Sequence, residues 1–181
     1  MEKIIEDLEK DLRNIIEGKP LGKPLREKMG DMVNVRLPRM MIFSLLWASV
    51  GYQSALRFAG MKLGRRLGES SGKTEISLVL EEIKKIIEEL GGGKAKIRMI
   101  PGLSGAELQI CSSFLTESVP NVLQNLCFFE EGFIEGYVGG VISKNRALSI
   151  AGGESAVTEV NVVEKRCIGL GDDCCMFLIK F

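Results

Sequence analysis

The sequence predicts an α+β fold, in which a helical N-terminal half packs on a mostly antiparallel sheet and one helix is inserted before the final strands. Three observations predict it. Apolar residues recur at helical spacing through most of residues 2–90, apolar and polar residues alternate over much of the second half, and one helical stretch interrupts that alternation. Helices that come first and strands that come later are typical of α+β proteins.

The N-terminal half begins with a predicted leader helix over residues 2–17, which Gly18 and Pro20 end. We interpret residues 1–18 as this leader helix and residues 19–181 as a single domain. Alternation over the next segment predicts a short strand, and apolar periodicity then predicts three helices: the strand covers 31–37 and the helices cover 40–48, 51–67 and 75–90. The first of the three is apolar nearly all round, which predicts a buried helix.

Three glycines lie four residues apart in the predicted helix 51–67 and just after it, at Gly60, Gly64 and Gly68. Each glycine inside a helix costs roughly 1 kcal/mol relative to alanine. Their spacing puts them close to one helical face, which favours a neighbouring backbone that approaches closely. We therefore predict a helix–helix contact there, either in the core or between subunits.

The second half predicts strands separated by one helix over 119–141. The strands cover 94–100, 106–112, 146–151, 158–167 and 174–181. The last two strands flank Gly171, Asp172 and Asp173, which are residue types that favour a tight turn. We interpret the two aspartates as turn residues rather than as a catalytic pair.

Composition excludes several kinds of site. The chain has no histidine, so no histidine base, Ser-His or Cys-His pair or imidazole ligand is possible. No dinucleotide-binding fingerprint or phosphate loop is present, so the sequence favours a protein that is not an enzyme. The 24 basic and 24 acidic residues balance and give no indication of nucleic-acid binding. We expect no membrane insertion, since the apolar run 40–50 is too short to span a bilayer.

The five cysteines are the strongest candidates for a site. The chain starts with charged, amphipathic residues rather than a signal peptide, so we expect a cytoplasmic protein with reduced thiols. Cys167 and Cys175 flank the predicted turn, and Cys174 must point to the opposite face of its strand from Cys175. Together with Cys111 and Cys127, Cys167 and Cys175 would suit a structural tetrahedral zinc. The alternative is that these cysteines are free thiols that fill the core.

A longer pattern extends from the helix to the final strand. Cys127 is followed by Gly132-Phe133-x-x-Gly136, then by Glu164-x-x-Cys167 and Gly171-Asp172-x-x-Cys175. This pattern resembles the 4-vinyl-reductase domain family over roughly residues 105–181, and residues 37–67 resemble the N-terminal half of that domain. The sequence departs from the family by about a dozen extra residues between Gly136 and Cys167.

The resemblance implies an α+β fold shared with TRAPP-type tethering subunits, and dimerisation through helices. In the sensor branch of the family, three cysteines and an acidic residue bind zinc beside a ligand pocket. The three cysteines correspond to Cys127, Cys167 and Cys175. Cys111 lies about where a fourth ligand is expected, with Glu107 or Glu117 as substitutes.

These observations favour a zinc-containing small-molecule-binding domain, a sensor or carrier with an apolar pocket, which forms a homodimer and has no catalysis of its own. A hydrophobic or aromatic small molecule fits such a pocket. Aromatic residues that either line it or fill the core are Trp47, Phe58, Phe114 and Phe133. Two alternatives remain: a tetrapyrrole vinyl reductase or its accessory protein, and an assembly subunit of the tethering-complex type.

Overall fold

The chain divides into the units Met1–Val50 and Gly51–Phe181, and each is described by itself. The structure is a computed structural model. It describes residues 6–7, 10–14, 17, 19, 33–48, 51–100, 105–150 and 156–181. The sequence predicted a different boundary, after residue 18, and that boundary stays a prediction.

In the first unit, residues 6–7 and 10–14 of the predicted leader helix are helical. The other residues of that predicted helix, apart from Glu17, lie outside the described part of the chain. Helix α2 spans Arg36–Ala48. The side-chain oxygen of Asn34 accepts a hydrogen bond from the Arg36 N–H at 3.0 Å, as a residue before a helix does when it caps the first turn.

The start of α2 corrects two predictions for this unit. The strand predicted over 31–37 is wrong for its described residues, because the cap at Asn34 begins a helix there. Met40 and Met41 are exposed, which corrects the prediction of a buried helix.

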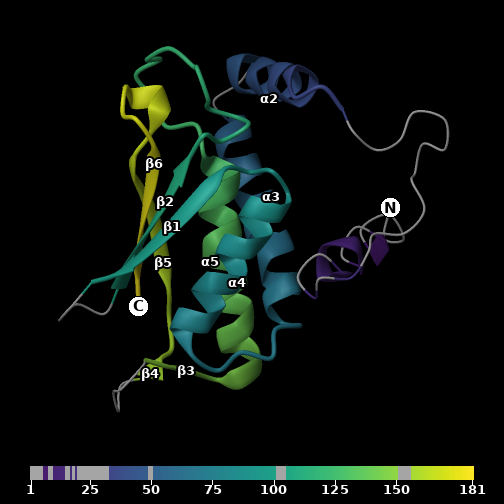
Figure 1. The fold of residues 1–181 in the computed structure, drawn as a ribbon, viewed down its shortest axis with the longest axis vertical. Helices are drawn as coiled ribbons and strands as arrows, with labels where there is room; N and C mark the ends of the chain where they lie inside the picture. Colours follow the sequence, from purple (N-terminus) through teal and green to yellow (C-terminus); the bar gives the residue numbers. More distant parts are fainter. Residues whose placement is uncertain are drawn as a thin grey trace. The chain divides into compact units, whose positions relative to one another are not determined.

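A four-stranded antiparallel sheet forms one layer of the second unit (Figure 1). Its strands, in spatial order, are β1 (Lys94–Met99), β2 (Gly105–Cys111), β6 (Cys175–Lys180) and β5 (Asn161–Arg166). Two short strands, β3 (Leu148–Ser149) and β4 (Ala156–Val157), form a separate antiparallel pair. The predicted antiparallel sheet is confirmed, with shorter strands than the alternation indicated.

The described part of the second unit also contains the α-helices α3 (Gly51–Gly68), α4 (Ile76–Glu89) and α5 (Phe128–Asn145). Helices α4 and α5 contact the sheet, and α3 packs along α5 (Figure 1). The core lies between the sheet and helices α4 and α5. Its fully buried side chains include Ile76, Leu80, Ile83, Leu108, Ile110, Ile134, Tyr137 and Phe177. The order of helices, sheet and inserted helix confirms the predicted α+β fold.

Helix α5 begins nine residues later than the helix predicted over 119–141, at Phe128. Ser118 and Leu123 have φ angles of 58° and 60°, which a right-handed helix does not contain. The segment before α5 is therefore an irregular connection that ends at Cys127.

The predicted glycine contact is confirmed, and it lies within the chain. A Cβ added at Gly60, Gly64 or Gly68 of α3 would come within 2.2 Å of a backbone oxygen of α5. Gly132, Gly136 and Gly140 of α5 are equally close to the backbone of α3. Two helices can approach this closely only where neither carries a side chain at the contact.

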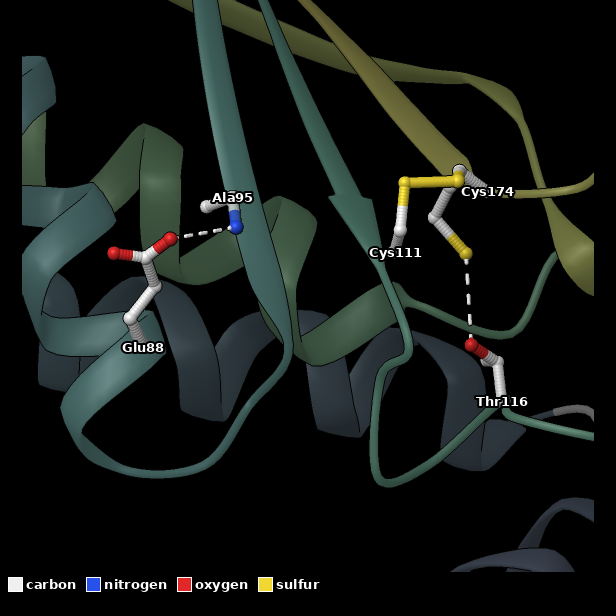
Figure 2. Close-up of a disulfide and its surroundings, with 6 residues drawn as sticks. Glu88, Ala95, Cys111, Thr116 and Cys174 are labelled. Atoms are coloured by element: carbon white, nitrogen blue, oxygen red, sulfur yellow. Dashed lines mark hydrogen bonds between the residues drawn. A yellow bond between two sulfur atoms is a disulfide. The ribbon is translucent and has the colours of Figure 1, made fainter.

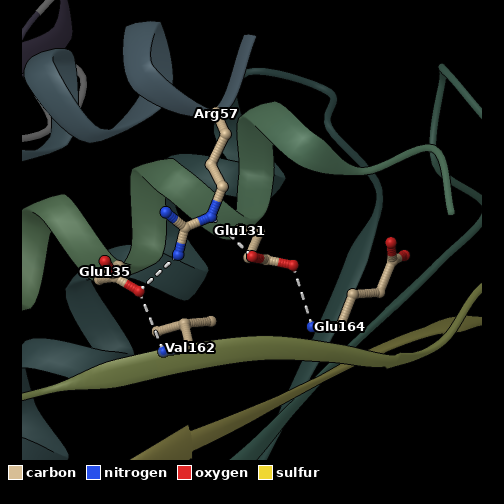
Figure 3. Close-up of polar contacts among 5 residues, drawn as sticks. All are labelled: Arg57, Glu131, Glu135, Val162 and Glu164. Atoms are coloured by element: carbon tan, nitrogen blue, oxygen red, sulfur yellow. Dashed lines mark hydrogen bonds and ion pairs between the residues drawn. The ribbon is translucent and has the colours of Figure 1, made fainter. Parts of the chain in front are cut away.

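Both edge strands of the sheet are hydrogen-bonded to helix carboxylates. The N–H of Ala95 in β1 donates to Glu88 of α4 at 3.0 Å (Figure 2). In β5, the N–H groups of Val162 and Glu164 donate to Glu135 and Glu131 of α5, both at 3.1 Å (Figure 3). Each edge therefore has backbone donors satisfied by its covering helix, which also protects it from pairing with another strand.

Arg57 connects helix α3 to the contact between α5 and β5. Its guanidinium pairs with Glu131 at 2.7 Å and with Glu135 at 2.8 Å (Figure 3). The pKa of Arg57 is raised, chiefly by the hydrogen bond to Glu131. One arginine thus holds the two carboxylates that fix β5 against α5.

In the described part of the chain, no helix combines the length and the apolar character that crossing a bilayer requires.

Candidate metal centre

Four buried side chains bring their ligand atoms within 4.8 Å of one another: Cys127, Glu164, Cys167 and Cys175. The exposed fractions are 2% for Cys127, 5% for Glu164 and zero for the other two cysteines. Three thiols and one carboxyl group so deep in a protein form a concentrated set of metal donors. We call these four residues the metal centre.

Each donor residue lies either at the end of a helix or strand, or on a strand with its side chain on the buried face. Cys127 directly precedes α5, and its carbonyl oxygen accepts the Glu131 N–H at 2.9 Å. Glu164 lies on the buried face of β5, two residues after the fully buried Val162. Cys175 is the first residue of β6 and occupies the buried face of the sheet. The donors thus meet where the start of α5 approaches one end of the sheet.

Cys167 follows a change of register in β5. A bulge lies between Glu164 and Arg166, after which the chain turns through a short 3₁₀ helix over Ile168–Leu170. The Asp172 carboxylate accepts the Cys167 N–H at 2.9 Å, and Gly171 has a φ of 94°, which favours glycine. The connection is longer than the predicted tight turn, but Asp172 serves as a turn residue, as predicted.

The three sulfur atoms are close enough to share hydrogens. The Sγ atoms of Cys127 and Cys175 are 3.1 Å apart, and those of Cys175 and Cys167 are 3.8 Å apart. The Leu126 N–H also donates to the Cys167 sulfur at 3.3 Å. Hydrogen bonds from Cys127 and Cys175 hold the pKa of Cys167 well below its ordinary value. Hydrogen bonds with Cys167 and Cys175, followed by burial, raise the pKa of Cys127 well above its ordinary value.

Glu164 has a buried carboxyl group that accepts no hydrogen bond within the described part of the chain. Neither of its side-chain oxygens accepts a hydrogen bond from the described residues, and the carboxyl group turns away from Arg57 in Figure 3. Burial, followed by the nearby Cys167 sulfur, raises the pKa of Glu164 to about 9. A buried carboxyl group without a partner is costly, and a bound cation would remove that cost and favour its charged form.

The donor set fits zinc. A tetrahedral zinc with Zn–S bonds of about 2.3 Å places neighbouring sulfurs roughly 3.8 Å apart. The Cys167–Cys175 separation is 3.8 Å, and the 3.1 Å between Cys127 and Cys175 requires only a small outward movement. Thiolates are soft ligands that favour zinc over magnesium or calcium. Four protein donors leave no open position, which is typical of a structural zinc.

The structure brings Cys127, Cys167 and Cys175 together, but it places Cys111 elsewhere. Cys111 forms a disulfide with Cys174 (Figure 2). This corrects the expectation that all five thiols are reduced. Cys174 and Cys175 point to opposite faces, as the strand period predicts: one sulfur is in the disulfide and the other in the metal centre.

The acidic substitutes for Cys111 also lie outside the metal centre. Glu107 pairs with Arg98 across β1 and β2, and Glu117 is exposed. The carboxylate that joins the cysteines is Glu164, which the prediction missed although it belongs to the Glu164-x-x-Cys167 pattern. Its signal in the sequence was its position two residues after Val162, which puts the two side chains on the same face of the strand.

The aromatic candidates for a pocket do not share one environment. Phe58 is 54% exposed, with the Lys62 ammonium 5.3 Å from its ring centre. Phe114 is half-buried. Phe133 is buried, and its ring centre lies 6.3 Å from that of Phe129 and 6.0 Å from that of Tyr137. The side chain of Trp47 lies outside the described part of the chain.

Comparison with known proteins places this arrangement among known folds. No family model matches the chain. Two uncharacterized proteins of Methanocaldococcus jannaschii are similar in sequence. One is 26% identical and covers 96% of this chain and 88% of its own length; the other is 27% identical and covers 85% and 81%.

A solved vinyl-4-reductase family protein from Methanocaldococcus jannaschii superimposes on nearly the whole chain. The match has a TM-score of 0.58 at 16% identity and covers 99% of this chain and 96% of the other. The chain has the vinyl-4-reductase fold. The fold that the Cys127–Cys175 pattern implied is thus confirmed.

Two other solved structures share the vinyl-4-reductase fold with this chain. A trafficking protein particle complex subunit 3 from Naegleria fowleri, covalently bound to palmitic acid, matches with a TM-score of 0.57 at 20% identity, over 81% of this chain and 94% of that chain. The phenol-responsive sensory domain of the transcription activator PoxR, with phenol, matches with a TM-score of 0.55 at 15% identity, over 85% and 78%. The implied relation to tethering subunits is therefore confirmed at the level of the fold.

Proposed function

We propose that the chain is a vinyl-4-reductase family member that binds a small apolar molecule, as a sensor or carrier, and that a structural zinc ion holds its C-terminal half together. The observation that carries the proposal is the metal centre: four buried donors within 4.8 Å of one another, with a carboxyl group that has no other partner among the described residues. Its ligands are Cys127, Glu164, Cys167 and Cys175.

Zinc at this position would fasten three pieces of chain. Cys127 holds the start of α5, Glu164 and Cys167 hold the end of β5, and Cys175 holds the start of β6. The ion supplies positive charge to donors that otherwise share protons. Because all four positions are filled by the protein, the proposal includes no catalytic step at the metal.

The small-molecule part of the proposal rests on the fold. Two solved proteins with this fold hold apolar compounds, phenol in one and palmitic acid in the other. In this chain, apolar side chains fill the layer between the sheet and helices α4 and α5, and a ligand that enters this layer would be of the same class. We assign the chain a hydrophobic or aromatic ligand.

The homodimer is also part of the proposal, with one restriction. The glycines of α3 contact α5 of the same chain. They are therefore not free to pair with a second subunit, and the dimer must use other surfaces.

Native mass spectrometry of the protein purified from zinc-supplemented cells tests these assignments together. We expect a dimer that carries one zinc ion per chain and retains an additional small-molecule mass, which organic extraction releases. A mass without zinc would contradict the metal centre. Zinc without any ligand, from cells and after addition of phenol or palmitate, would favour an assembly subunit over a sensor or carrier.

A further inference from the structure

The disulfide lies beside the metal centre and differs from it in exposure. Cys111 and Cys174 are half-buried, whereas the three cysteines of the metal centre are at most 2% exposed. Cys174 directly precedes the metal ligand Cys175, and the two sulfurs lie on opposite sides of the strand. The disulfide cysteines are therefore the more exposed of the two groups.

The disulfide holds a segment that the sheet does not hold. The pairing of β2 with β6 ends at Ile110 and Cys175, so Cys174 lies beyond the last paired residue. Residues 168–174 connect the ligand Cys167 to the ligand Cys175, and at their C-terminal end the cross-link to Cys111 ties them to the end of β2.

Cys111, the other partner of the disulfide, is connected to the metal centre through the segment that follows it. Cys111 ends β2, and the connection after it carries Thr116 and ends at the ligand Cys127. The Thr116 hydroxyl lies 3.8 Å from the Cys175 sulfur (Figure 2). One cross-link thus restrains both connections that bring cysteine ligands to the centre.

We propose that Cys111 and Cys174 form a thiol–disulfide exchange site that reacts with a dithiol reductant, and that its redox state sets how tightly the metal centre holds zinc. This inference rests on the proposed zinc site and assigns its regulation. The oxidised form presents preorganised ligands, and preorganisation strengthens binding. In the reduced form, residues 173–174 lose the cross-link and must be ordered when zinc binds, so this form binds zinc more weakly.

The exchange reaction balances without a further reactant. A thiolate of the dithiol attacks one sulfur of the disulfide, and the Cys111–Cys174 bond breaks as a mixed disulfide forms. The second thiol of the reductant then displaces the remaining cysteine and closes the reductant's own disulfide. Two electrons and two protons pass from the reductant to Cys111 and Cys174.

The first test compares zinc affinity in oxidised wild-type protein and in the double variant Cys111→Ser/Cys174→Ser, by competition with a chromophoric chelator. We expect the variant to bind zinc about tenfold more weakly, a loss typical of one lost element of preorganisation. Equal affinities in the two proteins would overturn the regulation and leave the zinc site intact. Failure of both proteins to bind zinc would instead overturn the proposed function and this inference with it.

The second test uses wild-type protein alone, so it does not depend on how the variant folds. The native protein is equilibrated with mixtures of a reduced and an oxidised dithiol that is too weak a chelator to remove zinc, and free thiols are counted by alkylation and mass spectrometry. Linkage requires zinc to stabilise the disulfide by the same factor by which the disulfide strengthens zinc binding. A tenfold effect moves the midpoint by about 30 mV toward more reducing values.

An unchanged midpoint with and without zinc would overturn the proposal. Reduction that takes place only after denaturation would also overturn it, because an exchange site must react in the folded protein.

Discussion

The variant Cys167→Ser is expected to lose zinc and to melt roughly 6–20 °C below wild type. The Cys167 sulfur is one of four buried donors that lie within 4.8 Å of one another, and it accepts hydrogen bonds from the Cys175 thiol and the Leu126 N–H. Removing one member of a buried charged group leaves the others uncompensated, which costs roughly 3–5 kcal/mol. For a domain of this size, at roughly 2–4 °C per kcal/mol, such a loss corresponds to a fall in Tm of about 6–20 °C.

Cys174→Ser is the matched control for this result. It is the same substitution next to Cys175, but the Cys174 sulfur lies outside the metal centre. Both variants are measured with zinc present and with a phosphine reductant that opens the disulfide in wild type as well. We expect Cys174→Ser to retain zinc and to melt close to reduced wild type. Equal losses of Tm in the two variants would contradict the placement of Cys167 at the centre.

The variant Gly64→Ala is expected to destabilise the second unit by about 3 kcal/mol, at the upper end of the cost of overpacking. A Cβ on Gly64 would lie 2.2 Å from the backbone oxygen of Phe133, so α3 and α5 must move apart to admit it. Movement of α5 also reaches the metal centre, because Cys127 directly precedes that helix. Chemical denaturation followed by circular dichroism measures the loss.

Gly139→Ala serves as its control, on the partner helix. A Cβ on Gly139 meets no atom within 4 Å, and alanine favours a helix over glycine by roughly 0.5–1 kcal/mol. The same substitution is therefore expected to stabilise the protein at Gly139 and to destabilise it at Gly64. A neutral or stabilising Gly64→Ala would show that the two backbones do not touch.

The fold could be predicted because its signals are local. Period-two alternation marked β1 and β2, and the spacing of Gly60, Gly64 and Gly68 indicated a close helix contact before its partner was known. The partner glycines Gly132 and Gly136 were in view as part of a motif, but a motif does not say which helix faces which. The start of α5 was missed because left-handed residues such as Leu123 leave no trace in apolar periodicity.

Part of the metal centre could also be predicted, because its motif is a local signal. Cys127, Cys167 and Cys175 follow from a motif with fixed spacing. The choice between Cys111 and Glu164 depends on which strands pair and in which register. Ile110 pairs with Cys175, so the residues just beyond them, Cys111 and Cys174, meet each other instead of the centre. No property of the single sequence gives that register.

X-ray absorption at the zinc edge, on zinc-loaded protein with its disulfide intact, tests the metal centre most directly. The structure predicts three sulfur neighbours at about 2.3 Å and one oxygen neighbour at about 2.0–2.2 Å, with the oxygen supplied by Glu164. The variant Glu164→Ala should keep the sulfur shell and lose the carboxylate. A first shell of four sulfurs, or a zinc edge with no sulfur neighbours, would contradict the assignment of Cys127, Glu164, Cys167 and Cys175.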